Sequence, residues 1–261
     1  ITCVDIDQGE LENSLIYIKE KINTDLSIFI PQLLNNVKND IKKDNWIQHL
    51  TDKKEKKFKI NAVSRDNKNY LNPYELLQKL FSLLPHNSVI VPDCGCNLIW
   101  SVQSYSAKTG QRFFTSWGHS PMGYSMPAAL GAWYAKKTST IVGIIGDGGV
   151  QMNIQELATV SKYQIPVKLF ILNNQCFGNT KFATKAEFEG RTTGNEVGQG
   201  YTPANYKKLA DCYNIEYNYL ENNKDLERNL TNIISTDSPI IVEVNVDPEQ
   251  YVFENKKITP E

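Results

Sequence analysis

The sequence lacks the features that would place it in a membrane, on a nucleic acid or outside the cell. It has no apolar run approaching the roughly 18 residues of a membrane-spanning helix and no signal-peptide pattern. The 28 Lys and Arg residues nearly balance the 29 Asp and Glu residues, so no excess of positive charge is available for nucleic acid or an anionic membrane. The five cysteines show no repeated pairing pattern, which favours reduced thiols. We therefore expect a cytoplasmic globular protein that binds neither nucleic acid nor membrane.

Two common cofactor and metal motifs are also missing. A dinucleotide site needs Gly-x-Gly-x-x-Gly after an early strand, and residues 146–149 (Gly-Asp-Gly-Gly) do not provide it. Residues 94–96 (Cys-Gly-Cys) have no second cysteine pair or histidine cluster that would complete four zinc ligands. The sequence therefore disfavours a dinucleotide-dependent enzyme and a zinc centre.

Polar residues follow two apolar segments at the points where the chain leaves an expected strand. Residues 141–145 lead into Gly-Asp-Gly-Gly, and residues 167–172 lead into Asn-Asn. Residues 151–163 between them have apolar side chains at helical spacing, so the unit is predicted as strand, turn, helix, strand. In a right-handed crossover the two strands can lie side by side, which brings Asp147 and Asn174 together at their carboxyl ends.

The residue types at this edge suit a metal and a phosphate. A carboxylate and an amide oxygen are hard ligands for Mg²⁺, which completes its shell with phosphate oxygens and water. Glycines 146, 148 and 149 allow backbone N–H groups to approach an anion at a helix N-terminus. Taken alone, Gly-Asp-Gly is equally compatible with an ordinary turn.

A longer pattern resembles a known family. Residues 146–159 (Gly-Asp-Gly-Gly-Val-Gln-Met-Asn-Ile-Gln-Glu-Leu-Ala-Thr), with Ile-Pro at 165–166 and Leu-Asn-Asn at 172–174, resemble the thiamine-diphosphate signature of acetolactate-synthase-like enzymes. Residues 93–100, 115–132 and 239–248 also look like segments of this family, so the resemblance covers nearly the whole chain. It implies thiamine diphosphate and Mg²⁺ as cofactors.

The resemblance also implies residue roles. Ser120 and Met122 would contact the aminopyrimidine through their backbones, with the Met122 side chain holding the cofactor in a bent shape, and nearby His119 is a candidate for substrate contact. The backbone carbonyl of Cys176 would complete the metal site. The implied cofactor contacts are Gly95, Cys96, Asn97, Ser120, Met122, Gly146, Gly148, Gly149, Phe177 and Gly178, and the implied metal ligands are Asp147, Asn174 and Cys176.

Alternating elements predict an α/β fold, a doubly wound parallel sheet with helices on both faces. Residues 1–50 look like the tail of the family's middle domain, 51–70 a linker, and 71–261 the domain for thiamine diphosphate and Mg²⁺. The chain opens without Met, as if it began within a longer protein. Expected helices cover residues 26–41, 73–84, 122–134, 151–163, 206–213 and 224–234, and expected strands cover 2–7, 88–91, 141–145, 167–172 and 239–248.

The implied activity is that of a transferase or lyase. It would decarboxylate pyruvate or a related 2-oxo acid and transfer the acyl unit, as a homodimer or homotetramer. Residues 177–184 lack the tryptophan that marks acetohydroxyacid-forming synthases, so the acceptor stays open and includes sugar derivatives. The family's activating glutamate belongs to a pyrimidine-binding domain of the same or a partner subunit, so no catalytic residue is assigned here and the isolated chain is expected to be inactive. The alternatives are a non-catalytic cofactor-binding or assembly subunit and a simple 2-oxo acid decarboxylase.

Overall fold

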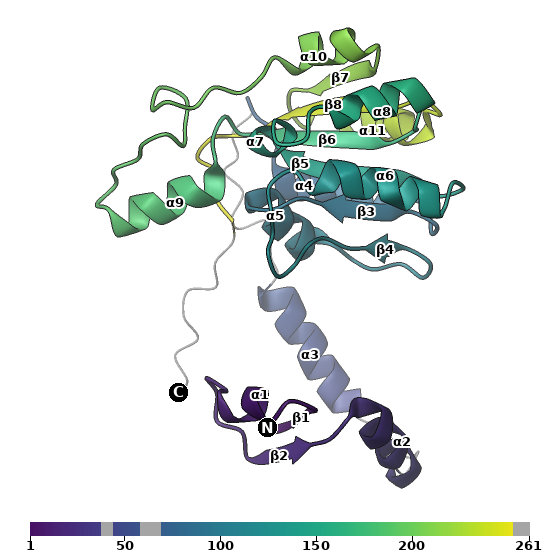
Figure 1. Cartoon of the computed structure of the whole chain (residues 1–261), viewed down its shortest axis with the longest axis vertical. Helices are drawn as coiled ribbons and strands as arrows, with labels where there is room; N and C mark the ends of the chain where they lie inside the picture. Colours follow the sequence, from purple (N-terminus) through teal and green to yellow (C-terminus); the bar gives the residue numbers. More distant parts are fainter. Residues whose placement is uncertain (38–43, 58–68, 253–261) are drawn as a thin grey trace. The chain divides into compact units, whose positions relative to one another are not determined.

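The computed structural model of the chain describes residues 1–37, 44–57 and 69–252. The chain divides into two compact units, Ile1–Lys59 and Ile60–Glu261, so the division falls within the segment 51–70 that the sequence suggests as a linker. The described part of the first unit holds a two-stranded parallel sheet and three helices (Figure 1). Its elements are β1 (Thr2–Asp5), α1 (Gln8–Glu12), β2 (Glu20–Asn23), α2 (Leu26–Asn36) and α3 (Asp44–Lys57).

Two expectations for this first unit change. Residues 51–57, which the sequence assigns to the linker 51–70, belong to helix α3, and residues 52 and 53 are exposed. The helix expected over 26–41 is observed as α2, which ends at Asn36 because Val37 is extended, and residues 38–41 lie outside the described part of the chain.

The second unit is built on a six-stranded sheet in which every pairing is parallel. The strand order is β4-β3-β5-β6-β8-β7. The strands are β3 (Val89–Pro92), β4 (Arg112–Phe113), β5 (Ile141–Gly146), β6 (Lys168–Asn173), β7 (Glu216–Leu220) and β8 (Ile240–Asn245). Strands β3, β5 and β6 are almost wholly buried, which explains why their sequences are continuous apolar runs.

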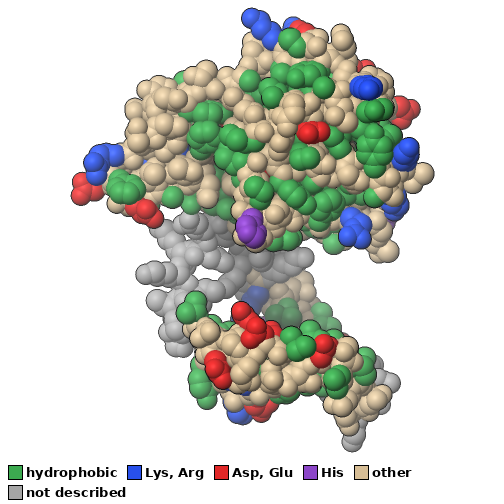
Figure 2. Space-filling model, viewed as in Figure 1, with side chains coloured by type: hydrophobic (Ala, Val, Ile, Leu, Met, Phe, Trp, Pro, Cys, Tyr) green, Lys and Arg blue, Asp and Glu red, His purple; other side chains and the backbone are tan. Residues whose placement is uncertain are grey.

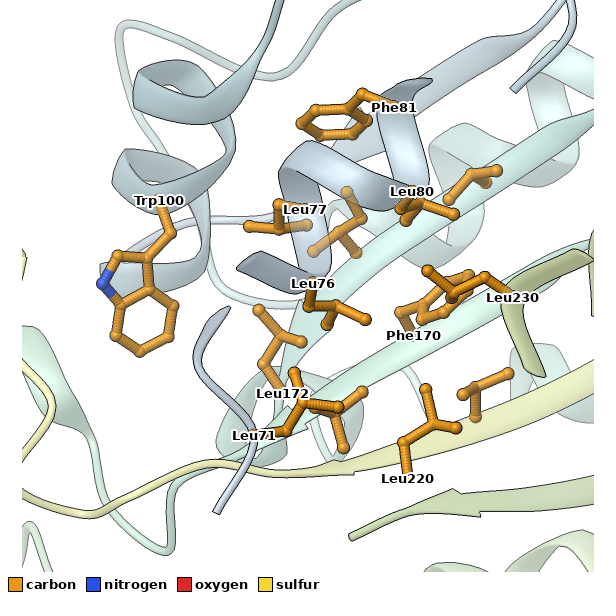
Figure 3. Close-up of a cluster of buried hydrophobic side chains, with 14 of the residues drawn as sticks. Leu71, Leu76, Leu77, Leu80, Phe81, Trp100, Phe170, Leu172, Leu220 and Leu230 are labelled. Carbon is orange, nitrogen blue, oxygen red and sulfur yellow. The ribbon is translucent and has the colours of Figure 1, made fainter. Parts of the chain in front are cut away.

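Helices cover both faces of this sheet (Figure 1). The helices are α4 (Pro73–Leu83), α5 (Cys96–Ser104), α6 (Ser125–Ala135), α7 (Asp147–Val150), α8 (Glu156–Tyr163), α9 (Gly178–Glu187), α10 (Tyr206–Tyr213) and α11 (Leu226–Ser235). Side chains of α4, α5 and α11 pack on one face, where Phe170 and Leu172 meet Leu76 and Leu80 (Figure 3). Side chains of α6, α8 and α10 pack on the other face. The predicted doubly wound α/β fold is confirmed.

Local sequence explains where several helices begin. The Asn72 side chain caps α4 by accepting a hydrogen bond from the Tyr74 N–H at 2.9 Å, and Pro73 occupies the first helical position.

Two of the helix starts expected from the sequence are wrong. Helix α6 begins at Ser125, after Gly123 with φ +85°, and Pro127 sits in its first turn, where no backbone donor is needed. Helix α8 begins at Glu156 rather than at residue 151, because residues 151–155 form turns between α8 and the short helix α7.

The surface of the second unit agrees with the balanced charge of the whole chain. Figure 2 shows Lys and Arg side chains interspersed with Asp and Glu side chains on the visible face, without a continuous area of one sign. Among the helices in the described ranges, none is both long enough and apolar enough to cross a membrane.

Candidate functional site

Strand pairing brings Asp147 and Asn174 to the same edge of the sheet. Strands β5 and β6 are parallel neighbours whose register ends with Gly146 opposite Leu172. Asp147 follows the last residue of β5 directly, and Asn174 follows the last residue of β6. The expected side-by-side arrangement of these two strands is therefore confirmed.

The Asp147 carboxylate is buried, and one of its two oxygens has no hydrogen-bond partner among the described residues. Its side chain belongs to a residue that is only 2% exposed, and Oδ1 accepts a hydrogen bond from the Gly148 N–H at 3.0 Å. Oδ2 is buried and has no hydrogen-bond partner among the described residues. Burial raises the pKa of Asp147 to about 7, against the opposing effect of nearby donors that include the N–H groups of Gly148 and Gln175. A buried carboxylate oxygen without a donor is the kind of atom that a bound cation would satisfy.

The backbone around Cys176 offers a second oxygen. Cys176 forms an antiparallel bridge with Glu196, and the hydrogen bonds of this bridge belong to the neighbours, with Phe177 N–H donating to Asn195 O at 2.8 Å and Val197 N–H donating to Gln175 O at 3.3 Å. In such a pair the carbonyl of the bridged residue points away from the partner segment. The thiol is a less suitable ligand, because Sγ donates to Pro248 O at 3.8 Å and Mg²⁺ prefers oxygen ligands.

The glycines near Asp147 have no room for a side chain. A Cβ on Gly148 would lie 2.2 Å from Phe177 Cε1 and 3.2 Å from Met122 Cε. A Cβ on Gly149 would lie 2.5 Å from Asp93 Oδ2. A side chain at either position would collide with its neighbours, so this turn requires glycine at residues 148 and 149.

Asp93 fixes the loop that carries Ser120 and Met122. Its carboxylate accepts hydrogen bonds from the backbone N–H of Gly123 at 3.0 Å and of Ser125 at 2.9 Å. Ser120 lies in this loop, after strand β4 and before Gly123, and has a left-handed backbone conformation with φ 44°. The Met122 side chain reaches over Gly148. The loop is thus held against the turn that carries Asp147.

These elements surround one cavity of about 260 Å³. Every residue that the sequence suggested as a cofactor contact or metal ligand lines it, so the structure brings the whole predicted set together, while their binding roles stay predictions. Asn97 is partly engaged within the protein, since its amide donates to Cys94 O at 2.6 Å and accepts from the Asp93 N–H at 3.2 Å. His119 is exposed and is not part of the lining.

Residues that the sequence did not suggest also line the cavity. They are Asp93, Cys94, Trp100, Leu172, Asn179 and Thr180. Asp93 could have been found by the rule that identified Asp147, because it follows the end of strand β3 in the same way. Asn179 and Thr180 lie in the first turn of α9, a helix that the sequence did not indicate.

Comparison with known proteins agrees with this site. Residues 93–244 match the family described as thiamine pyrophosphate enzyme, C-terminal TPP binding domain. The chain belongs to this family. The matched residues 93–244 begin directly after strand β3 and contain strands β4 to β7, strand β8 except for its last residue, and all of the cavity-lining residues; TPP stands for thiamine diphosphate.

Similar full-length proteins are large subunits of acetolactate synthase. The chain is 31% identical to the acetolactate synthase large subunit of Lactococcus lactis subsp. lactis (strain IL1403), over 96% of this chain and 42% of that protein. It is 30% identical to the acetolactate synthase large subunit of Cyanidium caldarium, over 92% and 41%. It is 28% identical to the isozyme 2 large subunit of Escherichia coli (strain K12), over 96% and 44%. The chain therefore spans less than half the length of these relatives.

Proposed function

We propose that this chain is the diphosphate- and metal-binding part of a TPP-dependent enzyme that decarboxylates pyruvate or a related 2-oxo acid and transfers the acyl unit. The observation that carries the proposal is the buried, unpaired Oδ2 of Asp147 at the shared edge of strands β5 and β6. Membership in the TPP-binding family and the similarity to acetolactate synthase subunits support the same reaction class.

The residues of the cavity fit the cofactor and its metal. Asp147, Asn174 and the carbonyl of Cys176 would supply oxygen ligands to Mg²⁺. The glycine turn at residues 146–149 would face the diphosphate, since Gly146, Gly148 and Gly149 line the cavity. When bound, TPP supplies the electron sink for decarboxylation, and the protein supplies orientation and electrostatics.

Met122 and Ser120 would set the shape of the bound cofactor. Met122 stays 37% exposed, and its Cε lies near Gly148, so its side chain is available to contact a ligand that reaches out of the diphosphate site. The Asp93 carboxylate holds this loop through its two backbone hydrogen bonds. The loop would thus position the cofactor's pyrimidine end.

The cavity needs a further acid–base group from elsewhere. Its lining contains two carboxylates, of which Asp93 is engaged by two backbone donors and Asp147 is the expected metal ligand. We infer that a pyrimidine-binding domain, of the same or a partner subunit, supplies the activating glutamate, in a homodimer or homotetramer. A cytoplasmic location stays a prediction.

Binding and product assays test this function. For the 261-residue chain alone we expect TPP binding that requires Mg²⁺, without release of carbon dioxide from pyruvate. Positioned acid–base groups contribute about 10²–10⁴ in rate, so turnover comparable to that of a protein that includes the pyrimidine-binding domain would contradict the composite site.

Product analysis on a protein with both domains separates the alternatives. Carbon dioxide together with a carboligation product supports the proposed reaction. An aldehyde as the sole organic product indicates a simple decarboxylase. TPP binding without turnover of any 2-oxo acid indicates a non-catalytic subunit.

A further inference from the structure

Tyr201 is a buried tyrosine that stands behind the expected metal site. It is 7% exposed, and its ring contacts the Phe177 ring with 4.5 Å between centroids. Phe177 in turn packs directly over Gly148, the residue that follows Asp147. Gly148, Phe177 and Tyr201 also line a common hollow beside the main cavity. The Phe177 ring therefore lies between the Tyr201 ring and the turn that carries Asp147.

The Tyr201 hydroxyl and the Oδ2 atom of Asp147 both lack a hydrogen-bond partner among the described residues. Tyr201 Oη and Asp147 Oδ2 are buried, and neither forms a hydrogen bond of normal geometry within the described structure. Phe177 links the two residues, since its ring contacts the Tyr201 ring and packs over Gly148, the residue after Asp147. Buried polar atoms without partners are unfavourable, so two neighbouring ones call for an explanation.

Residues 195–201 connect Tyr201 to Cys176, which is another expected metal ligand. The Tyr201 N–H donates to Glu196 O at 3.3 Å, and Glu196 is the bridge partner of Cys176. The Glu196 carboxylate pairs at 2.7 Å with Lys181, whose side chain is only 1% exposed. The segment 195–201 is therefore anchored to helix α9 and pairs with the loop that carries Cys176, while Tyr201 lines the same hollow as Gly148.

We propose that Tyr201 is a positioning residue of the metal site, whose hydroxyl donates a hydrogen bond to the Asp147 carboxylate and so directs the carboxylate toward the cation. The proposal rests on the proposed function, because it assumes that Asp147 binds Mg²⁺. The Gly148 N–H donates to Oδ1, and no side chain of the described residues forms a hydrogen bond to Oδ2. Outer partners of metal ligands typically change metal affinity by about 10- to 100-fold.

The test compares Tyr201→Phe with the unchanged chain. Tyr201→Phe keeps the ring on Phe177 and removes only the hydroxyl, which has no hydrogen bond to lose in the metal-free protein, so we expect an unchanged or higher Tm. With TPP present, we expect the affinity for Mn²⁺, used as a spectroscopic substitute for Mg²⁺, to fall by about tenfold or more. In the Asp147→Asn background, Tyr201→Phe should produce little further loss, because the two groups act as one unit.

Two control variants distinguish a loss of metal-ligand positioning from a general loss of structural stability. Tyr213→Phe removes a phenol on helix α10 outside the cavity lining, and should leave the Mn²⁺ affinity unchanged. Tyr206→Phe removes the hydrogen bond from Tyr206 Oη to Asp147 O at 3.0 Å, and should lower Tm.

Three outcomes would overturn the proposal. The first is an Mn²⁺ affinity in Tyr201→Phe equal to that of the unchanged chain. The second is an affinity loss that remains fully additive with Asp147→Asn. The third is a failure of the unchanged chain to bind Mn²⁺ and TPP, which would overturn the proposed function as well and is recognised because it does not involve the variant.

Discussion

The Asp93 carboxylate accepts a hydrogen bond from the backbone N–H of Ser125 at 2.9 Å, across 32 positions of sequence. Its other oxygen accepts from the Gly123 N–H at 3.0 Å, and the residue is 1% exposed. In Asp93→Asn the amide group retains one acceptor oxygen and turns N–H donors toward a backbone donor. We expect the free energy of unfolding to fall by about 1.5–3 kcal/mol, the range for hydrogen bonds to charged groups.

Urea unfolding measures this loss, with Asp211→Asn as the matched control. Asp211 is exposed on helix α10 and outside the cavity lining, so its substitution should change the unfolding free energy by less than about 0.5 kcal/mol. Equal stability of the two variants would show that Asp93 does not anchor the loop.

Gly148→Ala should damage the site and Gly131→Ala should not. The new Cβ at Gly148 would lie 2.2 Å from the Phe177 ring, so Phe177 must move, at a cost of about 1–3 kcal/mol for overpacking. At Gly131 in helix α6 nothing lies within 4 Å of the new Cβ, and alanine should stabilise the helix by about 0.5–1 kcal/mol. Thermal unfolding with and without TPP and Mg²⁺ measures both effects. An unchanged Tm in Gly148→Ala would contradict the close packing of Phe177.

The ion pair of Lys181 and Glu196 predicts a pH dependence. The hydrogen bond from Lys181 is the largest effect that holds the pKa of Glu196 below its usual range, followed by the hydrogen bond from Thr192. A lowered folded pKa means that the contribution of Glu196 is complete above its unfolded pKa of about 4.3 and is lost as the pH falls through the folded value. Glu196→Gln should therefore lower Tm at pH 7 and have a smaller effect at pH 3. An equal decrease at both pH values would contradict the linkage.

The sequence predicted the centre of the sheet better than its edges. Strands β3, β5, β6 and β8 are mostly apolar and mostly buried, and the sequence identified all four. Strand β4 has only two residues, and β7 (Glu-Tyr-Asn-Tyr-Leu) is partly exposed at the edge of the sheet. Their strand conformation depends on the neighbouring strand rather than on a local pattern, so the sequence alone did not show them.

The candidate site was predictable where it depends on connectivity. Asp147 and Asn174 could be paired because each follows a strand of one crossover unit. The role of Asp93 was not predictable, since its hydrogen bonds reach backbone groups 30 and 32 positions away. Tyr201 lies in an irregular segment whose course is set by the Cys176–Glu196 bridge and the buried Lys181, and neither interaction has a periodic signature.

The most direct test of the account is a calorimetric titration of TPP in the presence of Mg²⁺ into the unchanged chain, Asp147→Asn and the control Asp211→Asn. Asp147→Asn preserves the shape of the side chain and removes the charge that would balance the cation. Loss of a charge-assisted contact costs about 1.5–3 kcal/mol, so the account predicts a roughly 10- to 150-fold weaker affinity for Asp147→Asn and no change for Asp211→Asn. Equal affinity of Asp147→Asn and the unchanged chain would contradict the assignment of this cavity as the site of TPP and its metal.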